Sequence, residues 1–138
     1  MKTVVVDTNV FLSFVTDRDQ RQQAQAAGLF ESAADGQVQL ILPQIVLTEI
    51  VYVMANLYKR PDQDIAELLA DLLTMPHLRV EDRVRWSLVL DFWPKRISGF
   101  ADAVLAAVAT AGRHDAVASF DGKFLRRLAN LELAPYWD

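Results

Sequence analysis

Four of the eighteen acidic residues stand where their neighbours in the sequence would bury them. Asp7 follows the run Thr3–Val6, whose β-branched side chains predict a short strand buried on both faces. A carboxylate at the end of a buried parallel strand, directly before a helix, occupies the usual position of an α/β active site. The same position also suits a helix N-cap, so Asp7 is equally open to both interpretations.

Glu49 lies in a predicted helix that runs from Gln44 to about Tyr58. The residues three and four positions before and after it are largely apolar and share its face of the helix: Ile45, Val46, Tyr52 and Val53. A Glu side chain aimed into that stripe carries a large desolvation cost unless a cation or a hydrogen-bond donor meets it. We favour a functional site for Glu49 over the alternatives, a buried salt bridge or a partly solvated flank.

Asp102 and Asp121 each have a structural alternative as well. Asp102 is the one charge in a predicted helix of small and apolar residues, 100–111, where a first-turn acid also complements the helix dipole. Asp121 follows a predicted strand over 116–119, the same place that Asp7 occupies after the first strand. An Asp-Gly pair is also a strong turn signal, which is the commoner role of such a residue.

We expect the four carboxylates to lie close together, because two follow strands and two lie on helices predicted to flank those strands. Carboxylates gathered in one crevice repel one another, and bound hard cations are the usual remedy. Oxygen ligands favour Mg²⁺, with Mn²⁺ as the alternative, over Zn²⁺. The chain has no cysteine, and its two histidines, His77 and His114, fall in predicted turns where we expect surface residues. A carboxylate-held Mg²⁺ suits phosphodiester chemistry.

The elements that must position these acids alternate along the chain. Strands are predicted at 3–6, 38–42, 78–80 and 116–119, with 131–133 as an additional edge strand, and helices fill the intervals. This alternation predicts an α/β fold with a central four- to five-stranded parallel sheet and helices on both faces. Ligands of such sheets bind outside the carboxyl ends of the strands, where the strand order reverses.

Length and composition bound the class of protein. The 138 residues are 52% hydrophobic, without an internal repeat or a linker, so we expect one domain spanning 1–138. The apolar runs are far shorter than a membrane span, and no signal-peptide pattern precedes the first strand, which predicts a cytoplasmic protein. A net charge of −4 argues against a large non-specific nucleic-acid surface but permits local basic patches.

Four motifs, in their order and spacing, resemble those of PIN-domain ribonucleases. They are Val4–Asn9, Pro43 with Thr48–Val53, Phe100–Ala106 and Ser119–Phe124. Each motif is short and degenerate, but four of them in register along one chain form a specific signal. The compact length further resembles the VapC-type toxins of bacterial and archaeal toxin–antitoxin pairs.

The resemblance implies a single PIN-like domain that acts as a Mg²⁺- or Mn²⁺-dependent endoribonuclease on RNA phosphodiester bonds. It implies four catalytic acids: Asp7, Glu49, Asp102 and Asp121. Asp7 and Asp102 would be the direct metal ligands, and Glu49 and Asp121 would hold a second metal or orient and deprotonate the water. Small polar side chains would support the site through hydrogen bonds: Thr8, Asn9 and Ser119.

The resemblance also implies partners: an RNA substrate such as tRNA or another structured RNA, a cognate antitoxin and a second copy of the chain in a homodimer. Positive charge for RNA would have to come from the rim of the site. The candidate cations also fit ordinary solvated helix surface: Lys59, Arg60, Arg83, Arg85, Lys95, Arg96, Lys123, Arg126 and Arg127. Trp86 and Trp93 are suited to stacking bases, although core or dimer contacts are commoner for such a repeat.

Two alternative functions stay open, a stand-alone RNA-processing PIN nuclease and a non-catalytic PIN module used for binding. The intact set of acids counts against the second. A haloacid-dehalogenase phosphatase needs another Asp two residues after the first, where this chain has Asn9. A receiver-like domain needs an acidic pair at the end of the first strand, which is also missing.

Overall fold

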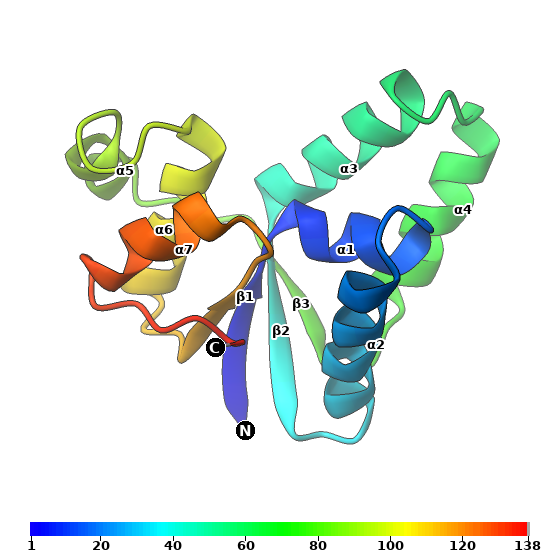
Figure 1. Cartoon of the computed structure of the whole chain (residues 1–138), viewed down its shortest axis with the longest axis horizontal. Helices are drawn as coiled ribbons and strands as arrows, with labels where there is room; N and C mark the ends of the chain where they lie inside the picture. The colour runs from blue at the N-terminus through cyan, green and yellow to red at the C-terminus, as the bar shows by residue number, and fades with distance from the viewer. Residues whose placement is uncertain (138) are drawn as a thin grey trace.

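The computed structural model describes residues 1–137 and has a four-stranded parallel sheet at its centre (Figure 1). Its strands are β1 (Lys2–Val6), β2 (Val38–Pro43), β3 (Leu78–Glu81) and β4 (Ala116–Ala118). They lie in the order β3-β2-β1-β4, and every neighbouring pair is parallel. The predicted α/β class and parallel sheet are therefore confirmed.

Seven helices lie on the two sides of this sheet within the described residues (Figure 1). One side carries α1 (Thr8–Val15), α2 (Gln20–Ala34), α3 (Gln44–Asn56) and α4 (Asp62–Leu73). The other side carries α5 (Trp86–Phe92), α6 (Phe100–Ala111) and α7 (Gly122–Ala129) (Figure 1). The chain moves outward from β1 to β2 and β3 and then crosses to β4 on the other flank of β1. Right-handed crossovers place helices on opposite faces when the direction changes in this way, so the strand order reverses at β1.

The central strand is apolar because both of its faces are covered. Val4, Val5 and Val6 are all 0% exposed, as are Leu40 and Ile41 of β2, which pair with Val4 and Val5. Stiff β-branched side chains favour the extended backbone, and a parallel strand buried on both sides has no polar face to alternate with. The continuous valine run therefore fits a strand in the middle of this sheet.

Helix α6 is buried on every side over its middle two turns. All residues from Ala103 to Ala109 are buried, which is the pattern of a helix that runs through a core instead of over a surface. Its many alanines have short side chains, so the helix lies close to its neighbours. This packing brings the first turn of α6, with Asp102, to the carboxyl end of the sheet.

The segment after α7 departs from the prediction. Residues 131–133 form a turn and a loop, so the expected edge strand at this position is wrong. The pairing with β4 comes slightly later: the Val117 N–H donates to the Ala134 carbonyl (2.9 Å), and the Tyr136 N–H donates to the Val117 carbonyl (2.8 Å). Glu132 has a positive φ of 60° and turns the chain, which the alternating Leu-Glu-Leu pattern does not reveal.

The two histidines also differ from each other. His77 is exposed as expected, but His114 is half-buried, and its Nε2 atom is buried without a hydrogen-bond partner among residues 1–137. Burial, the largest cause, lowers the pKa of His114, which favours the neutral form of the ring. The ring covers Gly112, where a side chain would overlap it. His114 precedes β4 and therefore lies at the end of the strand opposite to Asp121.

The buried sheet should dominate the stability of the fold. We expect Leu42→Ala, at a position that is 0% exposed, to lower the free energy of unfolding by about 2–5 kcal/mol, because a cavity remains in the sheet. The matched control is Leu73→Ala on α4, where the side chain is 48% exposed, with an expected change below about 0.5 kcal/mol. Urea unfolding of both variants measures the difference, and equal losses would contradict this account of the core.

Candidate active site

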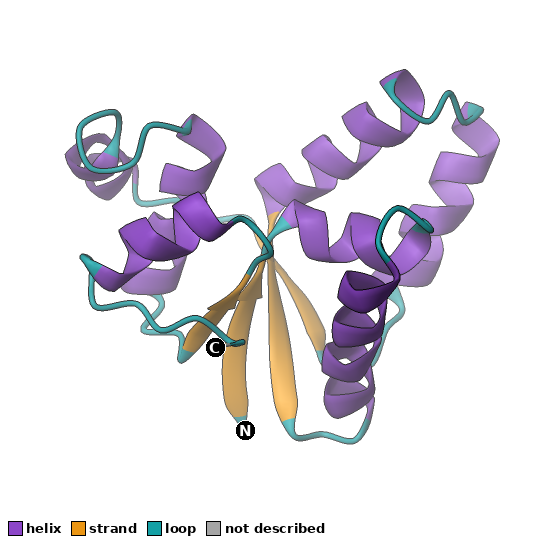
Figure 2. Ribbon diagram, in the orientation of Figure 1, coloured by secondary structure: helices purple, strands orange, loops and turns teal. Residues whose placement is uncertain are grey.

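The carboxyl ends of β1 and β4 meet at the point where the strand order reverses. Asp7 directly follows β1, and its backbone N–H donates to the Ala118 carbonyl at the end of β4 (2.9 Å). Figure 2 shows the strands converging at this end of the sheet, where α1 and α3 begin. Crevices of this kind are the usual ligand sites of open α/β sheets.

The two oxygens of Asp7 have separate partners. Oδ1 accepts the Thr8 backbone N–H (2.7 Å) and caps α1. Oδ2 faces β4, where it accepts the Ser119 hydroxyl (2.7 Å) and the Asn9 side-chain amide (3.2 Å). The N-cap interpretation of Asp7 is thus correct for one oxygen, while the other is held at the strand junction.

Asn9, in the first turn of α1, and Ser119, directly after β4, connect these two segments. The Asn9 amide nitrogen lies 3.3 Å from the Ser119 hydroxyl, and its Oδ1 atom accepts the Phe120 N–H (3.0 Å). The Ser119 hydroxyl oxygen also accepts the Asp121 N–H (3.1 Å). These bonds fix Asp7 and Asp121 relative to each other through side chains that are themselves fully engaged.

Asp121 is exposed and begins the last helix of the described chain. Its Oδ1 atom accepts the backbone N–H groups of Lys123 (3.0 Å) and Phe124 (3.2 Å), which makes it the N-cap of α7. Asp7 and Asp121 therefore have the same structural role, since each lies between a strand and a helix and caps that helix with one oxygen.

Glu49 reaches the site from α3. It is half-buried, and its Oε1 atom accepts the Thr8 hydroxyl (2.8 Å) at the start of α1. Only two ion pairs occur within residues 1–137, and both involve Glu81, so the salt-bridge alternative for Glu49 does not apply. A neutral hydroxyl offsets part of the desolvation cost that the apolar stripe predicts.

Asp102 lies in the first turn of α6, and its carboxylate has no hydrogen bond within the described part of the chain. The side chain turns back over Gly99, the N-cap of α6, where an added Cβ would lie only 3.1 Å from Oδ2. Gly99 is a supporting residue that the sequence reasoning missed, because a glycine before a helix has many explanations. Because Gly99 has no Cβ atom, the Asp102 carboxylate has room to lie against it.

The four acids act on one another electrostatically. Burial, the largest cause, raises the pKa of Asp7 to about 6, and the charges of Glu49 and Asp121 add to the rise, while the Ser119 and Thr8 hydrogen bonds oppose it. Burial also raises the pKa of Asp102 to about 7, with further contributions from the charges of Asp7, Asp121 and Glu49. The structure thus brings all four predicted acids into one negative cluster.

The donor set fits a hard cation by its chemistry. All candidate ligands are carboxylate oxygens, the negative charge has no positive partner, and the Asp102 carboxylate lacks any hydrogen bond within residues 1–137. No three acidic or imidazole side chains among these residues are already arranged as ligands of a single ion. A hydrated Mg²⁺ needs only one or two protein carboxylates, so a two-carboxylate site remains compatible with this arrangement.

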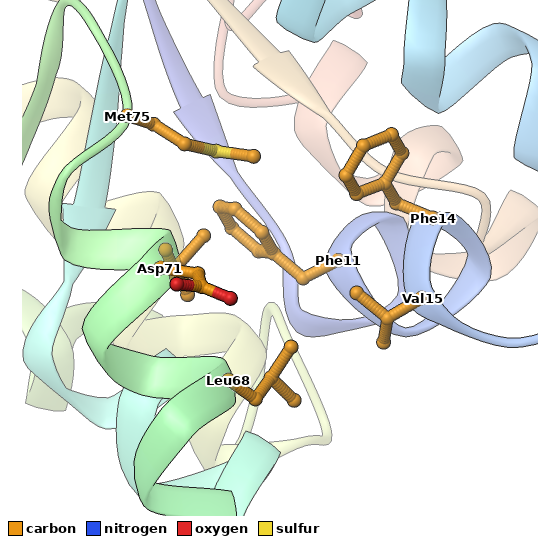
Figure 3. Close-up of a pocket in the computed structure, with 7 residues that line it drawn as sticks. Phe11, Phe14, Val15, Leu68, Asp71 and Met75 are labelled. Atoms are coloured by element: carbon orange, nitrogen blue, oxygen red, sulfur yellow. The ribbon is translucent and has the colours of Figure 1, made fainter.

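The apolar hollows of the molecule lie elsewhere. Two adjoining hollows of about 220 and 280 Å³ share Phe14 and Met75 and follow α1 away from Asp7. In the first, the side chains of Phe11, Val15 and Leu68 face one another between α1 and α4 (Figure 3). Asp71 is its one charged lining residue, so the hollow offers no cation to a phosphate. It is a separate feature from the acidic cluster.

Comparisons with known proteins agree with this geometry. A family profile described as the PIN domain matches residues 4–131. The VapC ribonuclease of Aquifex aeolicus (strain VF5) is 25% identical over 132 residues, which cover 96% of both chains. The structure of VapC20 from Mycobacterium tuberculosis, a toxin that cleaves the sarcin–ricin loop, superposes with a TM-score of 0.65 and 22% identity over 88% of this chain and 92% of that one. The structure of VapBC2 from Rickettsia felis, bound to a DNA fragment from the VapBC2 promoter, superposes with a TM-score of 0.67 and 19% identity over 99% of both chains.

The chain belongs to the PIN-domain family, as the match over almost its whole length shows. It is similar throughout to VapC-type ribonucleases at low sequence identity. None of its helices within residues 1–137 is long and apolar enough to cross a bilayer.

The raised pKa of Asp102 predicts how stability depends on pH in metal-free buffer. Between the ordinary pKa of 3.8 and the folded-state value of about 7, the unfolded chain has lost a proton that the folded protein keeps. The contribution of Asp102 to stability therefore falls as the pH rises through this window. We expect Asp102→Asn to melt at a higher temperature than the parent at about pH 8, with the difference shrinking towards pH 4.

Thermal unfolding in EDTA at several pH values measures this effect. The matched control is Asp82→Asn, the same exchange at an exposed loop position, which should leave the melting temperature unchanged. A parent that is more stable than Asp102→Asn at high pH would contradict the repulsive cluster.

Proposed function

We propose that this protein is a metal-dependent endoribonuclease that hydrolyses RNA phosphodiester bonds. The observation that carries the proposal is the electrostatically coupled cluster of four acids at the junction of β1 and β4. Membership of the PIN-domain family and similarity to a VapC ribonuclease support the same activity. Residues 1–138 act as one nuclease domain in the cytoplasm.

Asp7 and Asp102 are the proposed metal ligands. Asp7 is held rigidly by the Ser119 and Asn9 side chains, and Asp102 has a carboxylate without a hydrogen-bond partner in the described chain. Mg²⁺, or Mn²⁺ in its place, would lower the pKa of a bound water and neutralise phosphate charge there. The protein supplies the oxygen ligands, their orientation and a largely buried setting around Asp7.

Glu49 and Asp121 are the proposed groups that position and deprotonate the attacking water. Each has one oxygen engaged by the protein, Glu49 with the Thr8 hydroxyl and Asp121 with the first N–H groups of α7. Such bonds hold a carboxylate in place and leave its other oxygen for a water or an ion. General-base assistance of this kind typically contributes a factor of about 10²–10⁴ to a rate.

The biological role we propose is that of a toxin restrained by a cognate antitoxin. The similarity to VapC proteins supports it, and the Rickettsia felis structure contains VapBC2 bound to promoter DNA. A homodimer is proposed as well. It would cover exposed apolar side chains on and next to α3 and α5, each more than half exposed: Tyr52, Leu57, Trp86 and Leu90.

Cleavage of structured RNA tests the activity. We expect the parent to cut a pool of structured RNA that includes tRNA into discrete fragments with Mg²⁺ or Mn²⁺, and not with EDTA. Asp7→Asn and Asp102→Asn should each reduce the rate by about 100-fold or more, because each removes a charged ligand from the cluster. Asp82→Asn, an exposed acid away from the cluster, should cut like the parent.

Two results would contradict the proposal. Cleavage that persists in both site variants would place the activity outside the cluster. Absence of metal-dependent cleavage by a folded parent, free of any partner, would favour a binding module.

A further inference from the structure

The cationic residues of the chain are not evenly spread over the surface. Lys123, Arg126 and Arg127 lie three and four residues apart on one exposed face of α7, and with Asn130 they line a hollow of about 380 Å³. We call this set the α7 basic face. It stands out because the protein as a whole carries a net charge of −4.

The α7 basic face begins directly beside the acidic cluster. Asp121 caps α7 through the Lys123 N–H, so the first cation is two residues from a candidate catalytic acid. Arg126 reaches back over the same turn, since a Cβ added at Gly122 would lie 3.5 Å from its Nη1 atom. Positive and negative surfaces therefore adjoin at the N-terminal end of α7.

Stabilisation of the helix dipole does not explain where the Arg126 guanidinium lies. Arg126 and Arg127 occupy the last turn of α7, where a cation would complement the negative end of the helix dipole. The Arg126 guanidinium instead lies near the first residue, Gly122, at the positive end of the dipole, which is unfavourable for a cation. Neither arginine forms an ion pair within residues 1–137.

Arg96 extends the cationic surface towards α6. Its Nη2 atom donates to the Asn130 carbonyl at the end of α7 (3.3 Å), and its guanidinium lies 5.8 Å from the centre of the Phe92 ring. The same linker between α5 and α6 leads through Gly99 to Asp102. The cationic surface thus runs along α7, from Lys123 beside the acidic cluster to Arg96 at the far end of the helix.

The other candidate cations are placed differently. Arg83 is ion-paired with Glu81 (3.5 Å) and lines a hollow at the C-terminal end of α6, the end opposite to Asp102. Lys59 and Arg60 follow the C-terminal end of α3, about two turns beyond Glu49. Neither group adjoins the acidic cluster as the α7 basic face does.

We propose that the α7 basic face, together with Arg96, binds the phosphate backbone of the RNA strand next to the bond that is cut. This inference rests on the proposed nuclease function. A polyanion is repelled by the acidic cluster and needs adjacent positive charge to hold it there. Helix α7 has eight residues and is about 12 Å long, so its cations can contact neighbouring phosphates of one strand.

The experiment reverses two charges and measures RNA binding. Arg126→Glu combined with Arg127→Glu is made in the Asp7→Asn background, so that the RNA stays intact, and binding of fluorescently labelled tRNA is followed by anisotropy. We expect affinity to fall about tenfold or more. The magnitude of the slope of log affinity against log salt should decrease by about 1.4–1.8, which is about 0.7 for each lost contact with a single-stranded phosphate or about 0.9 for a duplex one. The Arg126→Lys, Arg127→Lys pair keeps the charge and should bind like the background protein.

Lys59→Glu with Arg60→Glu is the matched control, because it makes the same change in charge at cations remote from the cluster. A loss confined to the α7 pair, with an unchanged melting temperature, supports the inference. Equal losses in both pairs, or no loss in either, would overturn this inference without contradicting the proposed nuclease function. Failure of the underlying function is seen separately, as a parent protein that cleaves no RNA with Mg²⁺ or Mn²⁺.

Discussion

The structure depends on the confinement of negative charge at the carboxyl ends of β1 and β4. Asp7 is 7% exposed and accepts hydrogen bonds from Thr8, Asn9 and Ser119, yet burial and neighbouring carboxylates still raise its pKa to about 6. Asp102 has no such donors within the described residues, and its pKa rises to about 7. The fold thus retains charges that cost stability, which is the usual mark of a site maintained for function.

The surrounding structure holds these mutually repelling carboxylates in place with a rigid backbone, and it keeps positive charge outside the cluster. The valine strand and the buried middle of α6 fix the backbones from which Asp7 and Asp102 project. Asn9 and Ser119 then tie the start of α1 to the segment after β4, so Asp7 and Asp121 cannot simply move apart. Positive charge stays outside the cluster, on the exposed face of α7, where it can attract a polyanion without neutralising the acids.

Much of this arrangement was predictable from the sequence, because it depends on local patterns. The run Val4–Val6 specifies a strand buried on both faces, and the acids at the ends of strands follow from the parallel topology. Contacts between distant segments were not predictable in detail. Nothing in the sequence indicates that Thr8 donates to Glu49 or that Gly99 makes room for Asp102. The pairing of β4 with residues 134–136 depends on the turn at Glu132, and the burial of His114 depends on how its ring packs over Gly112.

The most direct test of the account is the number of protons released when Mn²⁺ binds. Isothermal titration calorimetry in two buffers of different ionisation enthalpy measures it for the parent and for Asp102→Asn. Because a cation binds the ionised carboxylates, the parent should release protons at about pH 6.5 and almost none at about pH 8.5, and Asp102→Asn should release fewer. Saturable binding that is the same in both proteins and releases no protons at either pH would contradict a metal site built on these carboxylates.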